Sequence, residues 1–285
     1  MEDRESYVPP VGIGEVMRAG SVGQVIESNN PDFKVGDKVQ GTFGWQEYAI
    51  SDGKGILNAT IIPEGSSLTA PLSVFGITGL TAYFGLLDVG QIKEGETVLV
   101  SGAAGSTGSI AAQIAKLKGC RVIGVAGGTE KCRWLTEVAK IDAAIDYKAA
   151  NLAEVIPELI PEGIDVIFDN VGGEFLDTAL LNINQSARIA VCGAISGYNN
   201  ETPSPGPSNY TSLIIQRARM EGFIVLDYMN KFPEAIGELM QWVQEGKIVY
   251  QEDIQEGIEN APDTLLRLYT GKNQGKQLLK IADPE

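Results

Sequence analysis

The stretch from Thr97 to Ile167 alternates short apolar runs with segments whose apolar residues recur at helical spacing. Such alternation is typical of a parallel sheet covered by helices. The predicted strands, including those from later apolar runs, cover residues 98–100, 121–126, 144–146, 164–168, 187–192 and 222–226. The predicted helices cover residues 109–118, 152–159, 175–181 and 232–245, and another starts near Thr129. Strands joined by helical crossovers predict an α/β fold with a doubly wound parallel sheet of the Rossmann type.

The first part of the chain has a different pattern. Between Val22 and Ile50 valines alternate with polar residues, and turn-forming groups interrupt them at 29–32 and 35–37, which predicts a small β-rich domain. The tail is predicted to form a short strand near 248–250, a helix over 261–269 and a strand over 277–281, and to return to that domain. We therefore expect three segments: 1–70 in the β-rich domain, 71–245 in the Rossmann domain, and 246–285 back in the first.

Length and composition indicate a soluble globular protein. The chain has 285 residues, 44% of them hydrophobic, which is enough for a well packed core. No apolar stretch approaches the ~18 residues that a membrane span needs, so we expect no membrane partner. The charged opening residues 1–5 are unlike a secretion signal, and the three widely spaced cysteines, Cys120, Cys132 and Cys192, suit reduced thiols. These features favour the cytoplasm.

The net charge and the absence of histidine disfavour several kinds of partner and of enzyme. A net charge of −15 repels phosphate backbones, so no nucleic-acid partner is expected. The sequence contains no histidine, the commonest general base and zinc ligand, and few cysteines, so no metal site is expected. Hydrolases built on Ser/His/Asp or Cys/His groups are also disfavoured. The class of reaction that remains is hydride transfer, in which a cofactor supplies the reactive atom.

One glycine-rich loop is the strongest functional motif. Gly102-Ala-Ala-Gly105-Ser-Thr-Gly108 has glycines at intervals of three, between a predicted strand and a predicted helix. Glycine allows the sharp turn and lets the backbone approach a pyrophosphate, whose charge is met by free N–H groups at the helix N-terminus. In this context the spacing predicts a dinucleotide-binding loop rather than an ordinary turn.

The end of the second predicted strand distinguishes NAD from NADP. An Asp or Glu there would hydrogen-bond the ribose of NAD and repel a 2′-phosphate. The chain instead has Gly127-Gly128-Thr129, with Lys131 and Arg133 just beyond. These residues leave room for a phosphate and supply a hydroxyl, backbone donors and two cations, so the predicted cofactor is NADPH. In the alternative interpretation, Lys131 and Arg133 only decorate a solvent-facing helix.

Loops after the later strands should face the same cofactor, because ligands lie at the carboxyl edge of a doubly wound sheet. Asn170 with Gly172-Gly173 follows the fourth strand, and Gly193 to Tyr198 follows the fifth. Amides and glycines suit contact with ribose and nicotinamide, although plain turns explain them equally well. Nothing near Cys192 in the sequence would lower the pKa of its thiol, so buried packing is favoured over a nucleophile.

Further motifs resemble one family. They are Tyr7-Val-Pro-Pro10, Gly14-Glu-Val-Met-Arg18, Gly44-Trp-Gln-Glu-Tyr48, Gly76-Ile-Thr-Gly-Leu-Thr81-Ala-Tyr83, Asp169-Asn-Val-Gly-Gly173 and Gly271-Lys-Asn-Gln-Gly-Lys276. Spread over essentially the whole chain, they are similar to motifs of the zinc-free medium-chain dehydrogenases/reductases, and especially of the prostaglandin, alkenal double-bond and curcumin reductases. The resemblance implies a GroES-like catalytic domain split by the Rossmann domain. It also implies NADPH-dependent reduction of a carbon–carbon double bond conjugated to a carbonyl, with hydride added at the β-carbon.

The loops above and the resemblance together give the expected site. The expected cofactor residues are Gly105, Ser106, Thr107, Gly108, Gly128, Lys131, Arg133, Tyr147, Asn170, Cys192, Gly193, Ala194, Ile195, Ser196, Phe223, Ile224, Val225 and Asn273. By resemblance, Lys131 lies near the 2′-phosphate and Tyr147 near the adenosine. Tyr198 is the candidate catalytic residue, with its hydroxyl facing the substrate, unless it merely covers the cofactor. Tyr7 and Tyr48 are candidate substrate contacts.

Members of this family normally have further N-terminal sequence before the point that corresponds to Met1. The opening strands of the catalytic domain are therefore expected to be lacking, which would expose sheet edges and part of the substrate wall. By analogy with the family we expect a homodimer and a small enone or enal substrate. Two other functions stay open, a quinone reductase of the same superfamily and an NADPH-binding protein without turnover.

Overall fold

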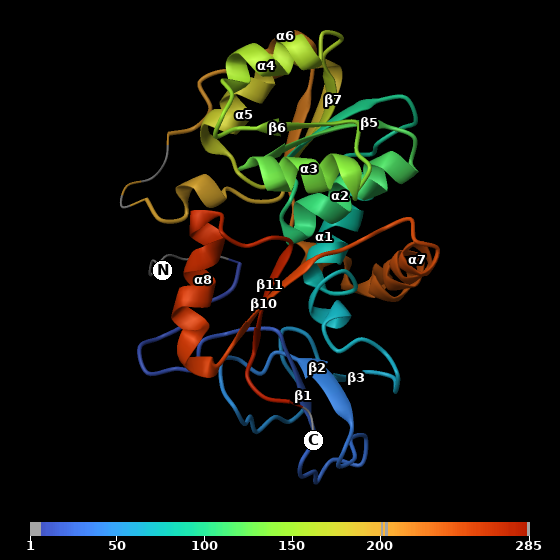
Figure 1. Ribbon diagram of the computed structural model, residues 1–285, viewed down its shortest axis with the longest axis vertical. Coiled ribbons are helices and arrows are strands. Elements are labelled where there is room, and N and C mark those ends of the chain that lie inside the picture. The colour runs from blue at the N-terminus through green and yellow to red at the C-terminus, as the bar shows by residue number, and fades with distance from the viewer. Residues whose placement is uncertain (1–6, 201, 203–204, 284–285) are drawn as a thin grey trace.

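A six-stranded parallel sheet forms the upper part of the computed structural model in Figure 1, which describes residues 7–200, 202 and 205–283. Its strands are β4 (Thr97–Ser101), β5 (Arg121–Ala126), β6 (Ala143–Asp146), β7 (Ile164–Asp169), β8 (Ile183–Val191) and β9 (Arg219–Gly222). They lie in the order β6-β5-β4-β7-β8-β9, and every pair is parallel. The order reverses between β4 and β7, so the predicted doubly wound sheet is confirmed.

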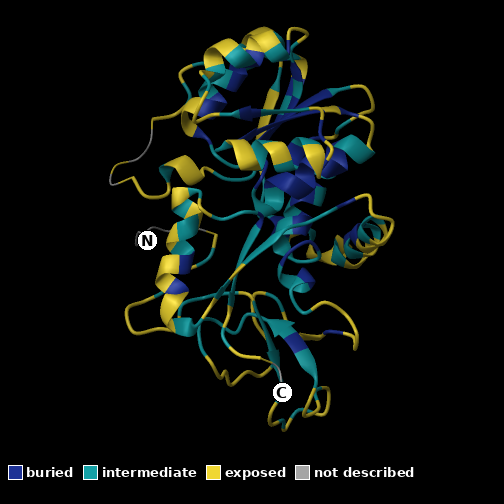
Figure 2. Cartoon of the chain, in the orientation of Figure 1, coloured by how far each residue is buried: buried dark blue, intermediate teal, exposed yellow. Residues whose placement is uncertain are grey.

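Helices cover both faces of this sheet. One apolar core takes residues from α1 (Ile77–Phe84), α2 (Ser106–Leu117), α3 (Thr129–Glu137) and α7 (Phe232–Gln244), and the other from α4 (Leu152–Leu159) and α5 (Gly173–Leu180). The short helix α6 (Ser212–Gln216) precedes β9. Every residue of β4 is buried, because a parallel strand meets a helical layer on each side. Figure 2 shows the buried residues gathered in this part, whereas α8 and the antiparallel part are mostly intermediate or exposed.

Most of the predicted elements form close to their expected positions. The strand over 121–126 and the helix over 152–159 have the predicted bounds. Helix α2 begins at Ser106 rather than Ser109, because Gly105 adopts an extended backbone and acts as the N-cap. The last residues of the glycine-rich loop therefore form the first turn of α2, so that their N–H groups lie at the helix N-terminus.

The sixth strand was predicted over residues 222–226, and this position is wrong. Strand β9 runs from Arg219 to Gly222, and all of its residues are exposed. The apolar run that suggested a strand continues instead into a 3₁₀ helix, Val225–Lys231, where Val225 is buried. An edge strand is paired on one side and can be polar, so the apolar pattern pointed to the wrong segment.

The short strand predicted near 248–250 is also wrong. Ile248 is 1% exposed and packs in the core, but it belongs to no strand. The strand forms just beyond it as β10 (Glu252–Glu256), which pairs in parallel with β11 (Lys276–Lys280). The apolar residue Ile248 packs in the core, whereas the residues of strand β10 are mostly polar. The hydrophobic pattern alone does not distinguish a packing residue from a strand residue.

The start of the chain forms the predicted antiparallel strands, β1 (Ser21–Gln24), β2 (Lys38–Gly41) and β3 (Thr60–Ile61). Strands β10 and β11, with helix α8 (Ala261–Thr270), lie between this small sheet and the parallel sheet (Figure 1). The division at residues 70 and 245 stays a prediction. No helix of the described ranges is long and apolar enough to cross a membrane, and the charged residues 1–5 lie outside those ranges.

The tail, residues 246–285, is hydrogen-bonded to α2 and to the glycine-rich loop that precedes it. Gln113 of α2 donates from Nε2 to the carbonyl oxygen of Val249 at 2.8 Å and accepts the Val249 N–H at Oε1, also at 2.8 Å. The N–H of Gly275 donates to the carbonyl oxygen of Ala104 at 3.1 Å, beside the glycine-rich loop. The start of β11 therefore lies directly against this loop.

Candidate cofactor site

The loop between β4 and α2 has a backbone that suits an anion. Gly102 has a φ of +57°, in the left-handed region that favours glycine. A Cβ on Gly108 would lie 2.3 Å from the carbonyl oxygen of Gly102 and 2.9 Å from the Cα of Ala103, so no larger residue fits. At Gly105 a Cβ would lie 3.1 Å from the same carbonyl oxygen. The tight turn therefore depends on the glycines that the sequence singled out.

The N-terminus of α2 opens onto this turn. The N–H groups of Ser106, Thr107 and Gly108 have no partner within the helix, and the N-cap Gly105 provides no side-chain bond. The hydroxyl of Ser106 donates to that of Thr78 in α1, with 2.8 Å between the oxygens. Free N–H groups at the positive end of a helix suit a pyrophosphate.

The end of β5 offers space and positive charge. Gly127 lies so close to the next loop that a Cβ on it would come 2.8 Å from both the Tyr147 ring and the Cε of Lys148. Burial, and then repulsion from Lys148, lower the pKa of Lys131 in α3. Two ammonium groups that repel each other are stabilised by a shared anion. The residues present therefore fit a dinucleotide with a 2′-phosphate.

Two details of this end differ from the sequence expectation. The N–H of Gly128 donates to Oδ1 of Asp146 at 2.8 Å, so it is not a free donor. Arg133 pairs with Glu130 at 2.7 Å on the exposed face of α3, where its side chain is 59% exposed. The structure thus brings Lys131 together with Lys148, whereas Arg133 matches the alternative interpretation of a solvent-facing cation.

Strands β4 and β7 are joined at their carboxyl ends by buried polar groups. The hydroxyl of Ser101 donates to Oδ1 of Asp169 at 2.7 Å, and Asp169 also accepts the N–H groups of Val171 and Gly172. Burial raises the pKa of Asp169, although these three donors oppose the shift. The carboxylate fixes the loop that follows β7 at the point where the sheet order reverses.

Asn170 is held by the same group. Its N–H donates to the Ser101 hydroxyl and its Nδ2 to the Ser101 carbonyl oxygen, both at 2.7 Å. One N–H of Nδ2 makes this bond, so the second N–H and the carbonyl oxygen Oδ1 stay available to a ligand. The sequence suggested an amide donor at this position, and the second N–H can fill that role, with Oδ1 as an acceptor beside it.

The loop after β8 lies along the loop after β7. The N–H groups of Cys192 and Gly193 donate to the carbonyl oxygen of Asp169, and those of Ile195 and Ser196 to Asn170 and Val171. Further along, the hydroxyl oxygen of Tyr198 accepts the N–H of Ala194 at 3.1 Å. Because this bond uses Tyr198 as an acceptor, its O–H proton can be donated elsewhere. The two loops therefore form one wall, with a half-exposed tyrosine on it.

Cys192 has the environment of a packed thiol. Burial, and then the charge of Asp169, raise the pKa of Cys192 to about 12. A raised pKa keeps the thiol protonated at every pH below that value, and the protonated form is a poor nucleophile. The packing role favoured from the sequence agrees with this.

The remaining expected residues differ in position. Asn273 donates from Nδ2 to the carbonyl oxygen of Gly275, beside the glycine-rich loop. Phe223 packs edge-on against Phe168, with 6.5 Å between ring centroids, so it belongs largely to the core. Ile224 is half-buried and Val225 is buried, just after β9.

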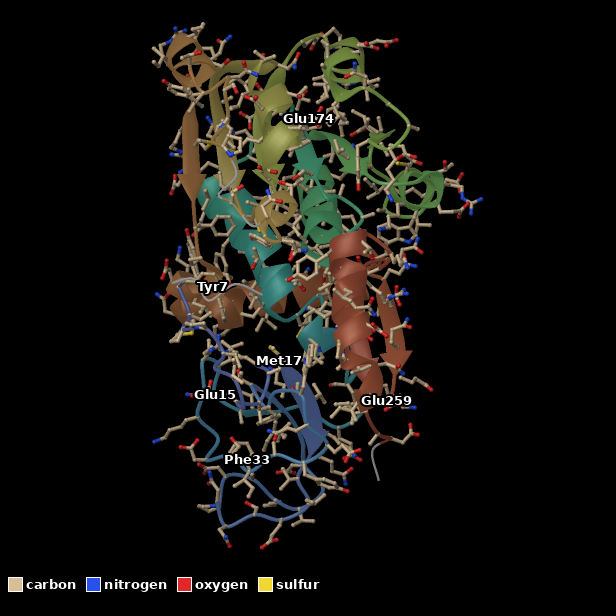
Figure 3. All side chains as sticks on the ribbon, turned by 90° about the vertical axis from the view of Figure 1, so that its left-hand side faces the viewer. Tyr7, Glu15, Met17, Phe33, Glu174 and Glu259 are labelled. Atoms are coloured by element: carbon tan, nitrogen blue, oxygen red, sulfur yellow. The ribbon has the colours of Figure 1, made fainter. Side chains whose placement is uncertain are left out.

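Tyr7 and Tyr48 are not brought into contact with these loops. Their side chains are 69% and 75% exposed, and neither makes a hydrogen bond or ring contact with another described residue. Figure 3 shows Tyr7 between the antiparallel part and the parallel sheet. Their role at a substrate stays a prediction.

Three residues at the carboxyl edge of the parallel sheet were not predicted from the sequence: Ser101, Lys148 and Asp169. Lys148 follows Tyr147 at the end of the third predicted strand, and its position opposite the two glycines after β5 could have suggested it. Ser101 and Asp169 are polar residues that end buried strands, and each is fully buried. A buried polar residue at a strand's carboxyl end is a usable sign, but their mutual bond joins residues far apart in the sequence.

Comparison with known proteins gives consistent matches. The profile of the family described as "Zinc-binding dehydrogenase" matches residues 106–244, and that described as "N-terminal domain of oxidoreductase" matches residues 1–59. Despite the first name, the sequence has no histidine, and no group of three or more possible metal ligands gathers in the described ranges.

Individual relatives are similar over nearly the whole chain. The NADPH-dependent curcumin reductase of Escherichia coli (strain K12) is 47% identical, over 99% of this chain and 83% of its own length. The 2-alkenal reductase (NADP(+)-dependent) of Nicotiana tabacum is 40% identical, over 97% of this chain and 80% of its own. The crystal structure of CurA from Vibrio vulnificus in complex with NADPH superposes with a TM-score of 0.93 at 44% identity, over 99% and 85% of the two chains.

Proposed function

The chain belongs to the medium-chain dehydrogenases/reductases, in the group of curcumin, prostaglandin and 2-alkenal reductases, and on this premise we propose that it reduces enones or enals with NADPH. The reaction converts the carbon–carbon double bond of an α,β-unsaturated aldehyde or ketone into a single bond. One observation carries the proposal. The glycine-rich turn, the lysines Lys131 and Lys148, and the loop that carries Tyr198 all lie at the carboxyl edge of one sheet.

The relatives support both the cofactor and the reaction. CurA was crystallised with NADPH, and the curcumin and 2-alkenal reductases are named for NADPH or NADP dependence. A 2-alkenal has a double bond conjugated to a carbonyl, which is the substrate class proposed here.

Each residue has a role in this proposal. Bound NADPH supplies the hydride. The N–H groups of Ser106 to Gly108 would hold its pyrophosphate, and Lys131 with Lys148 would hold its 2′-phosphate. Asn170 offers Oδ1 as an acceptor, and the Tyr198 hydroxyl would donate to the substrate carbonyl oxygen, where negative charge develops.

The test is the rate of NADPH oxidation with two substrate classes. We expect turnover with simple enones and enals that exceeds turnover with a quinone, measured at 340 nm under the same conditions. Turnover of the quinone alone would contradict the proposal in favour of a quinone reductase. NADPH binding without oxidation across the panel would contradict it in favour of a binding protein.

Changing Tyr198 to phenylalanine tests the donor. The variant keeps the ring and removes the O–H, so we expect kcat for an enone to fall by on the order of a hundredfold, with the Kd for NADPH unchanged. The measurement is steady-state kinetics alongside a fluorescence titration of NADPH. A kcat equal to that of the parent protein would leave Tyr198 as a cover for the cofactor.

The proposal includes a homodimer in the cytoplasm. The outer edge of β9 pairs with no strand in the described part of the chain, and Met220 of β9 and Ile214 and Ile215 of α6 are exposed. An unpaired strand edge suits pairing with a second copy, which sedimentation equilibrium would detect. All three cysteines are free thiols, as suits a reducing compartment.

A further inference from the structure

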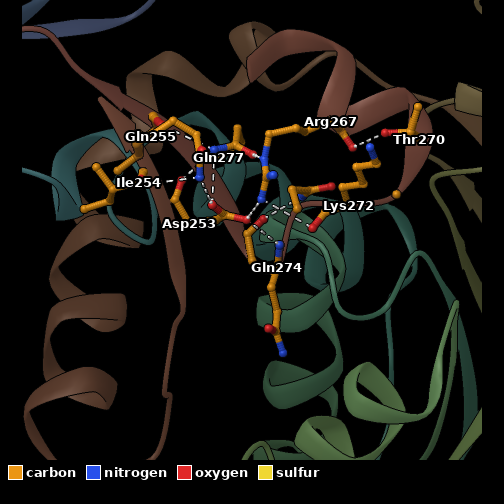
Figure 4. A network of polar contacts seen from close by, with 12 residues as sticks. Asp253, Ile254, Gln255, Arg267, Thr270, Lys272, Gln274 and Gln277 are labelled. Atoms are coloured by element: carbon orange, nitrogen blue, oxygen red, sulfur yellow. Dashed lines mark hydrogen bonds and ion pairs between the residues drawn. The ribbon is translucent and has the colours of Figure 1, made fainter. Parts of the chain in front are cut away.

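A polar network surrounds Asp253 at the start of β10 (Figure 4). Its Oδ2 accepts from the Arg267 guanidinium of α8 at 2.6 Å and from the N–H of Gln274 at 3.3 Å. Arg267 in turn donates from Nε to the side chain of Gln277 in β11 at 2.8 Å. Gln277 is the register partner of Asp253 and donates to its carbonyl oxygen at 2.7 Å. Asp253 therefore links β10 to α8 through its carboxylate and to β11 through its carbonyl oxygen.

The network fixes the loop 271–275, which links α8 to β11. This loop ends α8 with Gly271 in the left-handed conformation. The Asp253 carboxylate bonds the loop at Gln274, and the Arg267 guanidinium reaches the carbonyl oxygen of Lys272 at 3.5 Å. Asp253 and Arg267 thus hold the loop at Gln274 and Lys272.

The same loop holds the cofactor-side lysine. Lys131 donates from Nζ to the carbonyl oxygen of Gly271 at 2.8 Å. The other end of the loop is anchored by the bond from the Gly275 N–H to Ala104. Lys131 has three donors, so one can stay on Gly271 while others face a ligand. The orientation of the Lys131 ammonium therefore depends on where the loop lies.

Charge connects Asp253 to Lys131 as well. Burial and Lys148 lower the pKa of Lys131, whereas the negative charge of Asp253 acts in the opposite direction. Asp253 therefore favours the protonated form that can bind a phosphate.

We propose that Asp253 is a positioning residue for NADPH, which through Arg267 and the loop 271–275 holds the Lys131 ammonium where the 2′-phosphate binds. The inference rests on the proposed function, in which Lys131 contacts that phosphate. Asp253 itself touches no cofactor in this account. It sets the preference for NADPH over NADH from a distance.

The test compares Asp253→Asn with a matched control, Asp142→Asn. Asp142 also accepts from a cation, Lys116 at 2.9 Å, and from a backbone N–H, that of Val122, but it precedes β6 at the far end of the sheet. Both variants remove one negative charge. We expect Asp253→Asn to raise the Kd for NADPH about tenfold and that for NADH about twofold or less, with Asp142→Asn leaving both unchanged.

Two further readouts separate positioning from general stability. NADPH affinity should fall as pH rises through the pKa of Lys131, and Asp253→Asn should move this fall to lower pH, because the opposing charge is lost. In a Lys131→Ala background, Asp253→Asn should no longer alter the ratio of the two Kd values. Fluorescence titrations of NADPH and NADH between about pH 7 and 10 measure both effects.

The outcomes distinguish this inference from the function it rests on. Equal weakening of NADPH and NADH by Asp253→Asn, an unmoved pH profile, or the same effect from Asp142→Asn would overturn the positioning role. Failure of the parent protein to bind NADPH would overturn the proposed function instead. A parent that binds NADPH tightly, together with a variant that binds it equally well, would refute the inference alone.

Discussion

Replacing Lys131 by alanine is expected to raise the dissociation constant for NADPH about a hundredfold, while that for NADH changes about twofold or less. Lys131 is partly buried, and its pKa is lowered by burial and by Lys148. An anion placed between the two cations removes their repulsion, which a ligand without the 2′-phosphate does not do. Fluorescence titration with both nucleotides measures the two constants directly.

Arg133→Ala is the matched comparison for this change. Arg133 lies two positions further along α3, but it pairs with Glu130 in solvent, and exposed pairs contribute little. We expect its removal to alter the Kd for NADPH about twofold or less. If Lys131→Ala weakened NADPH and NADH equally, or if Arg133→Ala had the larger effect, the 2′-phosphate would have to bind elsewhere.

Gly108→Ala is expected to abolish measurable NADPH binding. The added Cβ would meet the Gly102 carbonyl oxygen at 2.3 Å and the Ala103 Cα at 2.9 Å, and backbone atoms cannot turn aside as a side chain can. The turn must open, which displaces the N–H groups at the start of α2 that would meet the pyrophosphate. We expect a loss of at least about a hundredfold in affinity and a cost of about 1–3 kcal/mol in the free energy of unfolding.

Gly237→Ala provides the control for Gly108→Ala. Gly237 lies in α7, and a Cβ there meets nothing within 4 Å. Alanine should stabilise this helix by about 0.5–1 kcal/mol and leave NADPH binding as in the parent. Thermal unfolding followed by circular dichroism shows whether each variant folds. A folded Gly108→Ala protein with unchanged NADPH affinity would contradict the assigned role of the turn.

The sequence predicted correctly the strands whose own residues are the apolar ones. Strands such as 121–126 are buried on both faces, so the run of apolar residues coincides with the strand. It failed at β9 and at residues 248–250, where apolar residues pack in the core outside any strand. The strands that form nearby, β9 and β10, are polar and have an open edge. The pattern of hydrophobic residues therefore does not reveal where they lie.

The candidate site was predictable where function depends on local backbone. The spacing of Gly102, Gly105 and Gly108 reflects a turn that only small residues can form. Hydrogen bonds between residues far apart in the chain produce no comparable pattern in the sequence. The Ser101 bond to Asp169 and the Asp253 bond to Arg267 each join ordinary polar residues, and only the folded chain brings them together.

The central claim is that this chain reduces a conjugated double bond with NADPH. Its most direct test is the structure of the product formed from a simple enone, identified by NMR after incubation with the protein and NADPH. We predict the saturated ketone, formed in step with NADPH consumption. An allylic alcohol, which arises from reduction of the carbonyl, or an enone recovered unchanged would contradict the account.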